Sequence, residues 1–541
     1  MSLTVRYIDT PVGAQEAAEA TGSEKQSFSE YSSVVSGAVD TPWATLESGV
    51  WSLDGSRKLL GDTPENIGWW SKTASGTDGS FTDPPTIEIS FAEPYTATAL
   101  SFAFWPSTNQ WCSELNVFWY NSDTLLDSVT AYPDSASWIL EHSVESFDKI
   151  VVKILATNQP RQFAKIQQIQ IGHVVTFGRK ELVSVQLLNE ADPSLCELSV
   201  DTMRIEIYNR DGRLLIPQEN QRMELHRNGK LMAVQYIQES SREAKCYYTI
   251  SCQSAVGLMS DDYLGGMFVD TPVETFLDDV LDGRRYELDA AFAGKTVSGY
   301  LPICSRRSAL QQLAFAIGAM ITTQESDAIR LIPVPSENTG SFANNRIFNG
   351  AKVSNSPRIA KVVVVSHNYT PTETEEVLLD SEDVSGEDVL FTFDEPHHSY
   401  VCDGGTITGS GANWVTISAV STVNLSAKTY LHSTKRYVRT NPEAIAAERN
   451  NVVTVDSVTL IHSDNAQEAL DRLYTAKMLR QTLSQEVVVS GHRAGQRVTS
   501  VNPWGTYTQG FITSMESTLT QNGHTAQIKM LGTELAEEEL T

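Results

Sequence analysis

The stretch TMRIEIYNRDG at Thr202–Gly212, followed by RMELHRNGKLMAVQYIQES at Arg222–Ser240 and AKCYYTISC at Ala244–Cys252, decides the fold. Apolar and polar residues alternate within each segment, which is typical of β-strands with one buried face. Asn-Arg-Asp-Gly and Arg-Asn-Gly separate the strands, and Asn and Gly tolerate the positive φ angles of tight hairpin turns. These features, with the preceding strand ELVSVQLLNE, predict a first β unit over residues 174–268.

A helical pattern follows this unit. Thr271-Pro272-Val273-Glu274 has the form of a capping box with Pro at the first helical position, and Gly283 is a stop signal. One apolar face is formed by Val273, Leu277, Val280 and Leu281. A second helix is predicted from about Ser305, with a face of Leu310, Leu313, Ala314 and Ile317. The strands VSGYLP and AIRLIPV accompany these helices, so residues 269–344 are predicted to be an α/β insert.

The β pattern returns at RIAKVVVVSHNYT (358–370) and in the C-terminal strands QEVVVSG, YTQGFITSMESTL and TAQIKMLG. We predict a second β unit from residues 345–370 and 485–535, interrupted by an insert at 371–484. Half of the sixteen residues from Glu373 to Asp388 are acidic, which indicates a solvated face. Helices are predicted to begin at Asn441-Pro442-Glu443 and at Asp464, and residues 536–541 form an acidic tail.

The first third of the chain has a different composition. Eight of the ten tryptophans lie between Trp43 and Trp138. Residues 1–44 are predicted to be an extended arm, because Gly13–Tyr31 is rich in Ala, Glu and Ser and has little to bury. Short alternating strands without helices between them then predict an all-β sandwich over residues 45–173.

Composition excludes several classes of function. The chain has 541 residues, with 40 Lys and Arg against 67 Asp and Glu, a net charge of −27. Such a surface repels phosphates, so neither sequence-specific nucleic-acid binding nor membrane binding is expected. No apolar run approaches the ~20 residues of a membrane span, and the N-terminus lacks the pattern of a signal peptide. The six cysteines form no C-x-x-C pair, so neither a zinc site nor a disulfide framework is expected.

Motifs that carry catalysis are incomplete. Gly294-Lys295-Thr296 resembles the end of a phosphate loop, but Asp289 stands where glycine is required. His397 and His398 are adjacent rather than four residues apart, so they do not form a helical metal site. Asp380-x-Glu382-Asp383 lacks the glycine of a calcium loop, and Gly409-Ser410-Gly411 fits a turn better than a nucleophile elbow. We therefore predict no enzyme activity, no cofactor and no metal, although paired carboxylates cannot be recognised from sequence.

One group of residues, four tryptophans with neighbouring amide side chains, suggests a glycan-binding site. Ile67–Ser71 and Trp105–Trp111 place four indoles beside amide side chains. Aromatic rings stack on sugar rings and amides bond sugar hydroxyls. The candidate glycan-contact residues are Trp69, Trp70, Trp105, Asn109 and Trp111. The alternative is that these tryptophans fill the core of the sandwich or pack between subunits.

Residues Trp51–Gly172 resemble discoidin-like (coagulation-factor C-type) jelly-roll β-sandwiches. The resemblance is carried by WSLDGS, IGWWS, PPTIEISF, ELNVFWY, FDKIVVKI and FAKIQQIQIG. The disulfide that usually ties the ends of such domains is absent, which fits a protein made in a reducing cell.

Residues from about Val175 to Gly532 resemble the tail hub proteins of phages and related injection machines. The carriers are the hairpins quoted first, VSGYLPICSRRSALQQLAFAIGAMI, RIFNGAKV, VVVVSHNYT and the final strands. The resemblance implies two hub β-barrels per chain that carry helix-containing inserts. It also implies a homotrimer, in which six barrels form a ring between a sixfold tail tube and a threefold tip; a hexameric distal-tail ring is the alternative.

This resemblance predicts a mainly β structural virion protein, a tail tip or baseplate hub that joins the tube to the tip and conducts DNA. The expected partners are tail tube and distal tail proteins, tip or fibre proteins and host surface glycan. The expected location is the virion after assembly in the host cytoplasm. A peripheral carbohydrate- or receptor-binding baseplate protein and a cell-wall-degrading tail enzyme are the alternatives.

Overall fold

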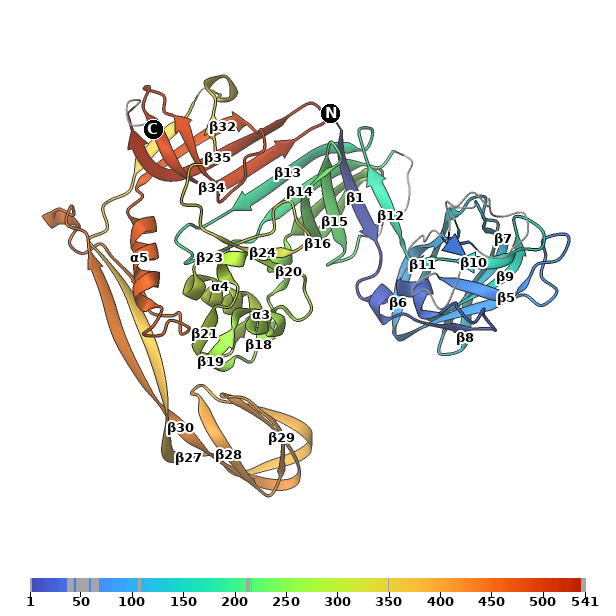
Figure 1. Cartoon of the computed structure of the whole chain (residues 1–541), viewed down its shortest axis with the longest axis horizontal. Coiled ribbons are helices and arrows are strands. Elements are labelled where there is room, and N and C mark those ends of the chain that lie inside the picture. Colours follow the sequence, from blue (N-terminus) through green and yellow to red (C-terminus); the bar gives the residue numbers. More distant parts are fainter. Residues whose placement is uncertain are drawn as a thin grey trace. The chain divides into compact units, whose positions relative to one another are not determined.

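The computed structural model describes residues 2–36, 43–44, 58–59, 68–105, 109–210, 215, 217–348 and 350–536 (Figure 1). It is 57% strand and 11% helix, which confirms the mainly β class. The chain forms two compact units. The N-terminal unit comprises Val5–Phe177 with Asp211–Glu224, and the C-terminal unit comprises Met1–Thr4, Gly178–Arg210 and Leu225–Thr541.

Two sheets share one core in the N-terminal unit. The larger sheet has the order β11-β6-β9-β7-β8, and β2 pairs with β6. Its strands are β2 (Glu19–Gly22), β6 (Thr86–Ala103), β7 (Cys112–Asn121), β8 (Thr124–Ala131), β9 (Ser137–Thr157) and β11 (Gln168–Ile171). The smaller sheet pairs β5 (Trp69–Ala74) with β10 (Phe163–Ile166). Trp69 of β5 and Ile166 of β10 pack with Ile87 and Phe102 of β6, so the layers form a sandwich. The strand pair β3 (Trp43–Ala44) and β4 (Lys58–Leu59) is parallel, and most of predicted residues 45–67 lie outside the described residues.

The predicted extended arm over residues 1–44 is wrong for residues 3–36. Strand β1 (Leu3–Asp9) pairs with β12 (His173–Phe177), and its alternating residues Leu3, Val5 and Tyr7 are buried. Two short helices follow, α1 (Ala14–Ala17) and α2 (Ser32–Ser36). Ala14 and Val34 are fully buried in the sandwich core. A few apolar side chains at the right spacing are therefore enough to fix a segment whose average composition is polar.

The C-terminal unit is built on one continuous sheet made of two halves. The first half has the order β15-β16-β17-β14-β13 and the second the order β34-β35-β32-β26. The strands of the first half are β13 (Leu182–Glu190), β14 (Thr202–Tyr208), β15 (Arg222–Arg227), β16 (Lys230–Ala244) and β17 (Tyr247–Gln253). Those of the second are β26 (Lys352–Asn355), β32 (Gln481–Val488), β34 (Tyr507–Leu519) and β35 (His524–Leu535), with β33 (Arg497–Val501) on β34 and β25 (Ser341–Phe342) on β33.

The halves join where β13 pairs with β34 in antiparallel register, from Val185 opposite Leu519 to Glu190 opposite Ser514. The second half has its own core, which includes Leu483, Ile512 and Ile528. Asn228 and Gly229 have φ angles of 52° and 77°, as expected for a tight turn between β15 and β16. The strands predicted within residues 182–253 and 485–535 therefore lie in one continuous sheet.

One predicted segment of the second half lies elsewhere. Residues 361–370 begin the long strand β27 (Lys361–Thr392), which pairs with β30 (Trp414–Thr440) and β31 (Val452–Val455). Val362 and Val364 pack into the core of the helices instead of that of the second half. The assignment of 361–370 to the second β unit is therefore wrong, because a run of four valines specifies a buried strand but not its partner. Strand β32 also begins at Gln481, before the predicted residue 485.

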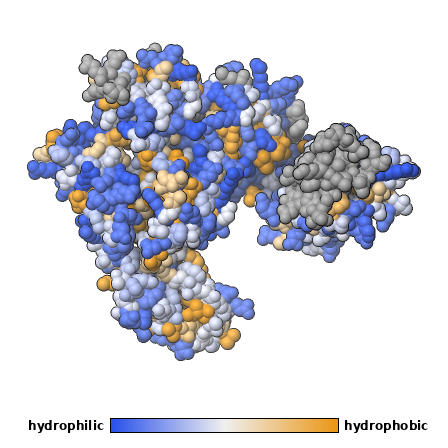
Figure 2. Space-filling model, viewed as in Figure 1, coloured by the Kyte–Doolittle hydropathy of each residue, from blue (hydrophilic) through white to orange (hydrophobic). Residues whose placement is uncertain are grey.

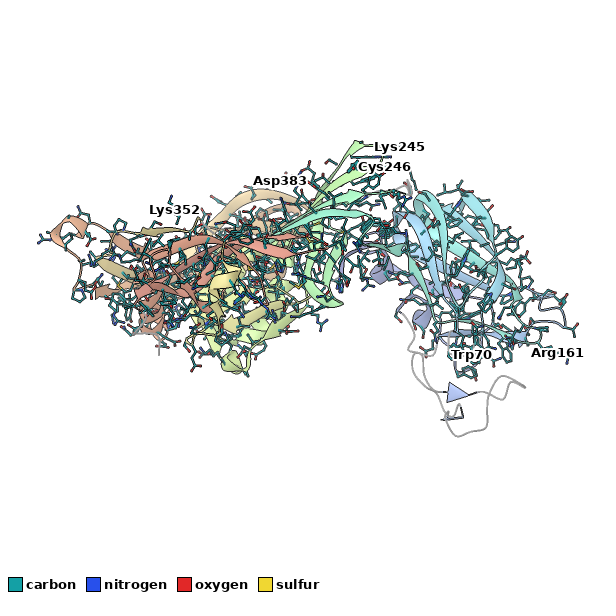
Figure 3. All side chains as sticks on the ribbon, turned by 90° about the horizontal axis from the view of Figure 1, so that it is seen from above. Trp70, Arg161, Lys245, Cys246, Lys352 and Asp383 are labelled. Atoms are coloured by element: carbon teal, nitrogen blue, oxygen red, sulfur yellow. The ribbon has the colours of Figure 1, made fainter. Side chains whose placement is uncertain are left out.

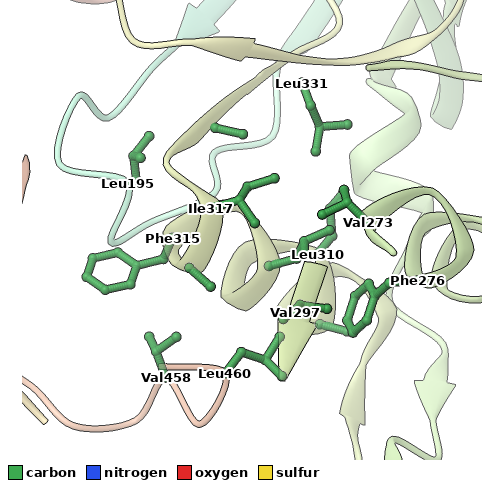
Figure 4. Packing of buried hydrophobic residues seen from close by; sticks show 14 of the residues in the cluster. Leu195, Val273, Phe276, Val297, Leu310, Phe315, Ile317, Leu331, Val458 and Leu460 are labelled. Carbon is green, nitrogen blue, oxygen red and sulfur yellow. The ribbon is translucent and has the colours of Figure 1, made fainter. Parts of the chain in front are cut away.

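Three helices share one large core. Figure 4 shows the part of this core around Phe276 and Leu310. They are α3 (Val273–Leu281), α4 (Arg306–Ile317) and α5 (Ala466–Lys477), all at predicted positions. Short strands surround them: β18 (Asp262–Tyr263), β19 (Gly266–Pro272), β20 (Tyr286–Leu288), β21 (Thr296–Leu301), β22 (Cys304–Ser305), β23 (Ala319–Thr322) and β24 (Ile329–Pro333). The 3-10 turns span Ala255–Leu258, Ala290–Phe292, Asn344–Arg346 and Ala446–Glu448. Helix α5 belongs to the second predicted insert but packs with the first, so the helices of both inserts form a single body.

The helix caps differ in detail from the predictions. Ser305 caps α4, and its side chain accepts a hydrogen bond from the Ser308 amide. Pro272 is the N-cap of α3, because Thr271 remains in β19 opposite Val297. The predicted capping box is therefore wrong. The helix predicted from Asn441 is also wrong, since only the 3-10 turn at Ala446–Glu448 forms there.

Arginines hold the carbonyl ends of two helices. Arg472 of α5 donates to the Phe315 and Ala316 carbonyls of α4, at 2.8 and 3.3 Å. Arg306 donates to the Asp279 and Val280 carbonyls of α3, at 2.8 and 2.9 Å. The last carbonyls of a helix have no partner within the helix and carry partial negative charge. A cation at each end therefore fixes α3, α4 and α5 to one another.

The rest of residues 371–484 forms a long hairpin. Strands β27 and β30 run together, and β28 (His397–Asp403) and β29 (Thr406–Ser410) pair with β30 near its far end. A small separate core there contains Val384, Ile417 and Leu425. Most of the acidic residues from Glu373 to Asp388 are exposed along β27, so this stretch is a solvated strand face.

Candidate functional site

Three of the five candidate glycan-contact residues lie inside the N-terminal unit. Trp69, Trp70 and Trp105 are 0%, 2% and 1% exposed. Trp70 is labelled in Figure 3. Its ring makes T-shaped contacts with Phe28, at a centroid distance of 5.4 Å, and with Trp105, at 5.2 Å. Buried rings of this size contribute core packing, and their faces are not free to stack on a sugar. Their burial favours the alternative interpretation, in which the tryptophans fill the sandwich.

A lysine lies against this aromatic cluster. Lys165 of β10 is 2% exposed, and its Nζ lies 4.2 Å from the centre of the Trp70 ring. The same Nζ donates to Gln110 Oε1 at 2.8 Å. A cation over an indole face is stabilised by the ring quadrupole, most strongly when water is excluded. Alternation would not predict this inward lysine, because a β-bulge between Phe163 and Lys165 shifts the register.

The other two candidates lie at the edge of the cluster. Asn109 is exposed and has a φ of 56°. Trp111 is half-buried, and its Nε1 donates to the Pro133 carbonyl at 3.0 Å. Asn158 joins the two, because it accepts from the Trp111 amide at 3.1 Å and donates to the Asn109 carbonyl at 3.0 Å. The structure thus brings the candidates together, but it exposes only Asn109 and part of Trp111.

The candidate assembly site is the platform formed by the two sheet halves. A loop of the α/β insert touches both of them. The Gln324 side chain accepts from the Ala494 amide at 3.1 Å and donates to the Ala494 carbonyl at 3.3 Å. Glu325 pairs with Lys230 of the first half, at 2.7 Å, and with Arg493 of the second. These contacts attach one loop of the insert to both halves.

A buried carboxyl group adds a further contact between this loop and the first half. We call the contacts of Gln324, Glu325 and Asp201 together the clamp. Asp201 is 5% exposed, and it accepts from the Glu190 amide at 3.0 Å and from the Thr323 hydroxyl at 3.2 Å. Burial raises the pKa of Asp201 to about 6, and the hydrogen bonds offset only part of this effect. The group therefore loses its proton at a far higher pH than an exposed aspartate.

Large apolar side chains are exposed on the second half. Trp504 is 58% exposed and Phe348 is 43% exposed. The Trp504 Nε1 donates to Glu534 Oε1 at 2.8 Å, so the orientation of the indole is set in advance. Hydrogen bonds from Thr506 and Trp504 lower the pKa of the Glu534 carboxyl. The face of the molecule drawn in Figure 2 is largely hydrophilic, with several apolar patches. Exposed, oriented aromatic rings of this kind are enriched in protein interfaces.

The described residues carry neither grouped metal ligands nor a membrane-spanning helix. Among them, no three His, Cys, Asp or Glu side chains are grouped as metal ligands. No helix among the described residues is long and apolar enough to cross a membrane. All six cysteines are unpaired, and burial raises the pKa of the Cys112 thiol to about 12.

Solved structures similar to this chain include tail proteins and a carbohydrate-binding module. No family model and no curated protein matches the sequence. The chain is similar to the 43 kDa tail protein of prophage MuSo2 from Shewanella oneidensis, with 10% identity and a TM-score of 0.41 over 66% of this chain and 94% of that one. It is similar to the tail protein from Neisseria meningitidis MC58, with 10% identity and a TM-score of 0.43 over 66% and 93%. The family 32 carbohydrate-binding module of NanJ from C. perfringens, solved with galactose, matches at 13% identity and a TM-score of 0.20 over 32% of this chain and 99% of that one.

Proposed function

We propose that this chain is a structural protein of a phage tail or tail-like particle, a hub of the tail tip or baseplate. The observation that carries the proposal is the edge-to-edge pairing of β13 with β34, which joins two β halves in one chain. A ring wall needs consecutive β segments from each copy, and this chain supplies two. Three copies would give six segments, which suits a junction between a sixfold tube and a threefold tip.

The clamp between the halves supports this role. A wall segment keeps its curvature only if the angle between its parts is fixed. Gln324 and Glu325 bind groups from both halves, and Asp201 ties the end of β13 to Thr323 of the same loop. The helical body thus acts as a brace behind the sheet.

The exposed aromatic residues of the second half would meet a neighbour. We assign Trp504 and Phe348 to the contact with the next copy or with the tail tube, because both are large, apolar and exposed. The N-terminal unit would be peripheral. The net charge of −27 suits a conduit for DNA, because like charge prevents adsorption. In a gel-shift assay at ~50 mM salt, where electrostatic binding is strong, the assembled protein is expected not to retard duplex DNA.

Native mass spectrometry of the full chain tests the proposal. The expected species is a trimer that appears as a ring in negative-stain images. Trp504→Ser is expected to shift the population toward monomer, while Tyr132→Ser, which changes an equally exposed aromatic residue of the N-terminal unit, is expected not to. A chain that stays monomeric at every concentration, alone and with tail tube protein, would contradict the hub. Six copies would indicate a distal-tail adaptor instead.

The proposal includes the absence of catalysis. The purified chain is expected to release no soluble fragments from peptidoglycan or capsule. Steady release that scales with protein concentration would favour the tail-enzyme alternative.

A further inference from the structure

A groove of about 400 Å³ lies between the α/β insert and the far end of the long hairpin. Its size is within the range of ~300–1,000 Å³ typical of small-ligand sites. The insert contributes Tyr263, Gly265, Gly266, Met267, Phe268 and Asp279. The hairpin contributes residues of β28, β30 and the end of β29 with the loop that follows it, chiefly His397, His398, Tyr400, Ser410 and Tyr430.

The two walls of the groove are tied together. Tyr300 of β21 donates to the Asp394 carbonyl at 3.2 Å, just before β28. Its ring also meets Tyr369 of β27 edge-on at 5.4 Å. Contacts within the chain therefore hold the two walls together before any ligand binds.

Two histidine nitrogen atoms at the groove have no hydrogen-bond partner among the residues that the structure describes. His397 is 4% exposed, and its Nε2 lies 3.2 Å from Glu376 Oε2. In the neutral ring the carboxylate holds the proton on Nε2, so Nδ1 is an acceptor. His397 Nδ1 is buried without a hydrogen bond, and so is Nε2 of His398. A buried polar atom without a partner is costly, so a site that contains two of them is suited to a ligand with hydrogen-bond donors.

The other side chains of the groove indicate which kinds of ligand it can bind. Neither Lys nor Arg is among the described residues that line it, while Asp279 adds a carboxylate. An anionic ligand would thus be repelled. Tyr400 and Tyr430 are half-buried aromatic rings, suited to the apolar face of a sugar. Asp279, already oriented by a hydrogen bond from Tyr263, would accept from a hydroxyl.

We propose that this groove binds a neutral saccharide of one or two rings, with hydroxyls donating to His397 Nδ1 and Asp279 and a ring face on Tyr430. The inference goes beyond the hub proposal and does not depend on it. It also differs from the glycan site expected in the N-terminal unit, because the residues come from β28, β30 and α3.

The test uses the full chain on an array of neutral mono- and disaccharides, followed by calorimetric titration of the best binder. Tyr430→Ala and Asp279→Asn are each expected to weaken its Kd about tenfold. Tyr132→Ala, an exposed tyrosine of the N-terminal unit, is the matched control and is expected to leave the Kd unchanged. Thermal melts of all variants establish that each is folded. The proposal is overturned if no neutral saccharide binds, if only anionic ones bind, or if both groove variants bind as the wild type does.

Discussion

Substitution of Asp201 by asparagine is expected to stabilise the chain at neutral pH and to have little effect in acid. The pKa of Asp201 is about 6 in the folded chain against an ordinary value of 3.8. Between these values the unfolded carboxyl has lost its proton while the folded one retains it, so the free energy of unfolding falls as pH rises. At ~1.36 kcal/mol per pH unit, the group contributes about 3 kcal/mol below pH 4 that is lost above pH 6. Asparagine has the same shape and does not ionise, so the variant avoids this loss.

Urea denaturation followed by far-UV circular dichroism measures the effect for both proteins from pH 3.5 to 7. The free energy of unfolding of Asp201→Asn, minus that of the wild type, is expected to rise by about 3 kcal/mol over this range. Asp380→Asn, an exposed aspartate on β27, is the control, and its difference should stay within about 0.5 kcal/mol. A difference that does not change with pH for Asp201→Asn would refute the reasoning, because it would mean that the buried group does not hold its proton.

Three further predictions concern packing, each measured by thermal unfolding with circular dichroism. Gln324→Ala leaves the Ala494 amide without an acceptor and is expected to lower the free energy of unfolding by about 1–3 kcal/mol. A decrease no greater than that caused by Gln→Ala at an exposed position would argue against the clamp. Arg472→Met keeps an unbranched apolar stem but removes the donors to the end of α4, so the free energy of unfolding is expected to fall by about 2–3 kcal/mol; an unchanged Tm would show that the α4 carbonyls need no cation. Trp105→Ala should destabilise the N-terminal unit by about 3–5 kcal/mol, far more than Trp111→Ala, and equal effects would mean that Trp105 does not fill the core.

Local patterns predicted much of the structure. The spacing of Leu310, Leu313 and Ile317 predicted α4, and Ser305 predicted its start, because helix periodicity and capping are decided within a few residues. The Asn228-Gly229 turn likewise placed the β15–β16 hairpin. Packing partners that are distant in the sequence were harder to predict. Val362 and Val364 read as a buried strand, yet nothing in the run itself shows that it packs against helices rather than against the second sheet half.

The residues of the candidate binding sites were harder to predict than the strand partners. A cluster of tryptophans predicts a sugar platform and a packed core equally well, and only the fold shows that Trp69, Trp70 and Trp105 are buried. The spacing of His397 and His398 excludes a helical metal site, and the sequence around them indicates no other site. Their place opposite Asp279 in a groove depends on contacts between residues more than 100 positions apart, which sequence patterns do not encode.

The β13–β34 pairing also has a consequence for biosynthesis. Val185 is translated long before its partner Leu519, and at ~5–20 residues per second the ribosome needs roughly 20–60 s to make the intervening chain. During that interval the edge of β13 that later pairs with β34 has no strand beside it, so it is open to pairing with another nascent chain. Leu3 of the N-terminal strand also lacks its partner Gln521 until the C-terminal strands are made. The Leu3 amide donates to the Gln521 side chain, and the Leu3 carbonyl accepts from it. A chain truncated before residue 507 should therefore aggregate, and full-length yield should depend on cellular factors that shield this edge until synthesis ends.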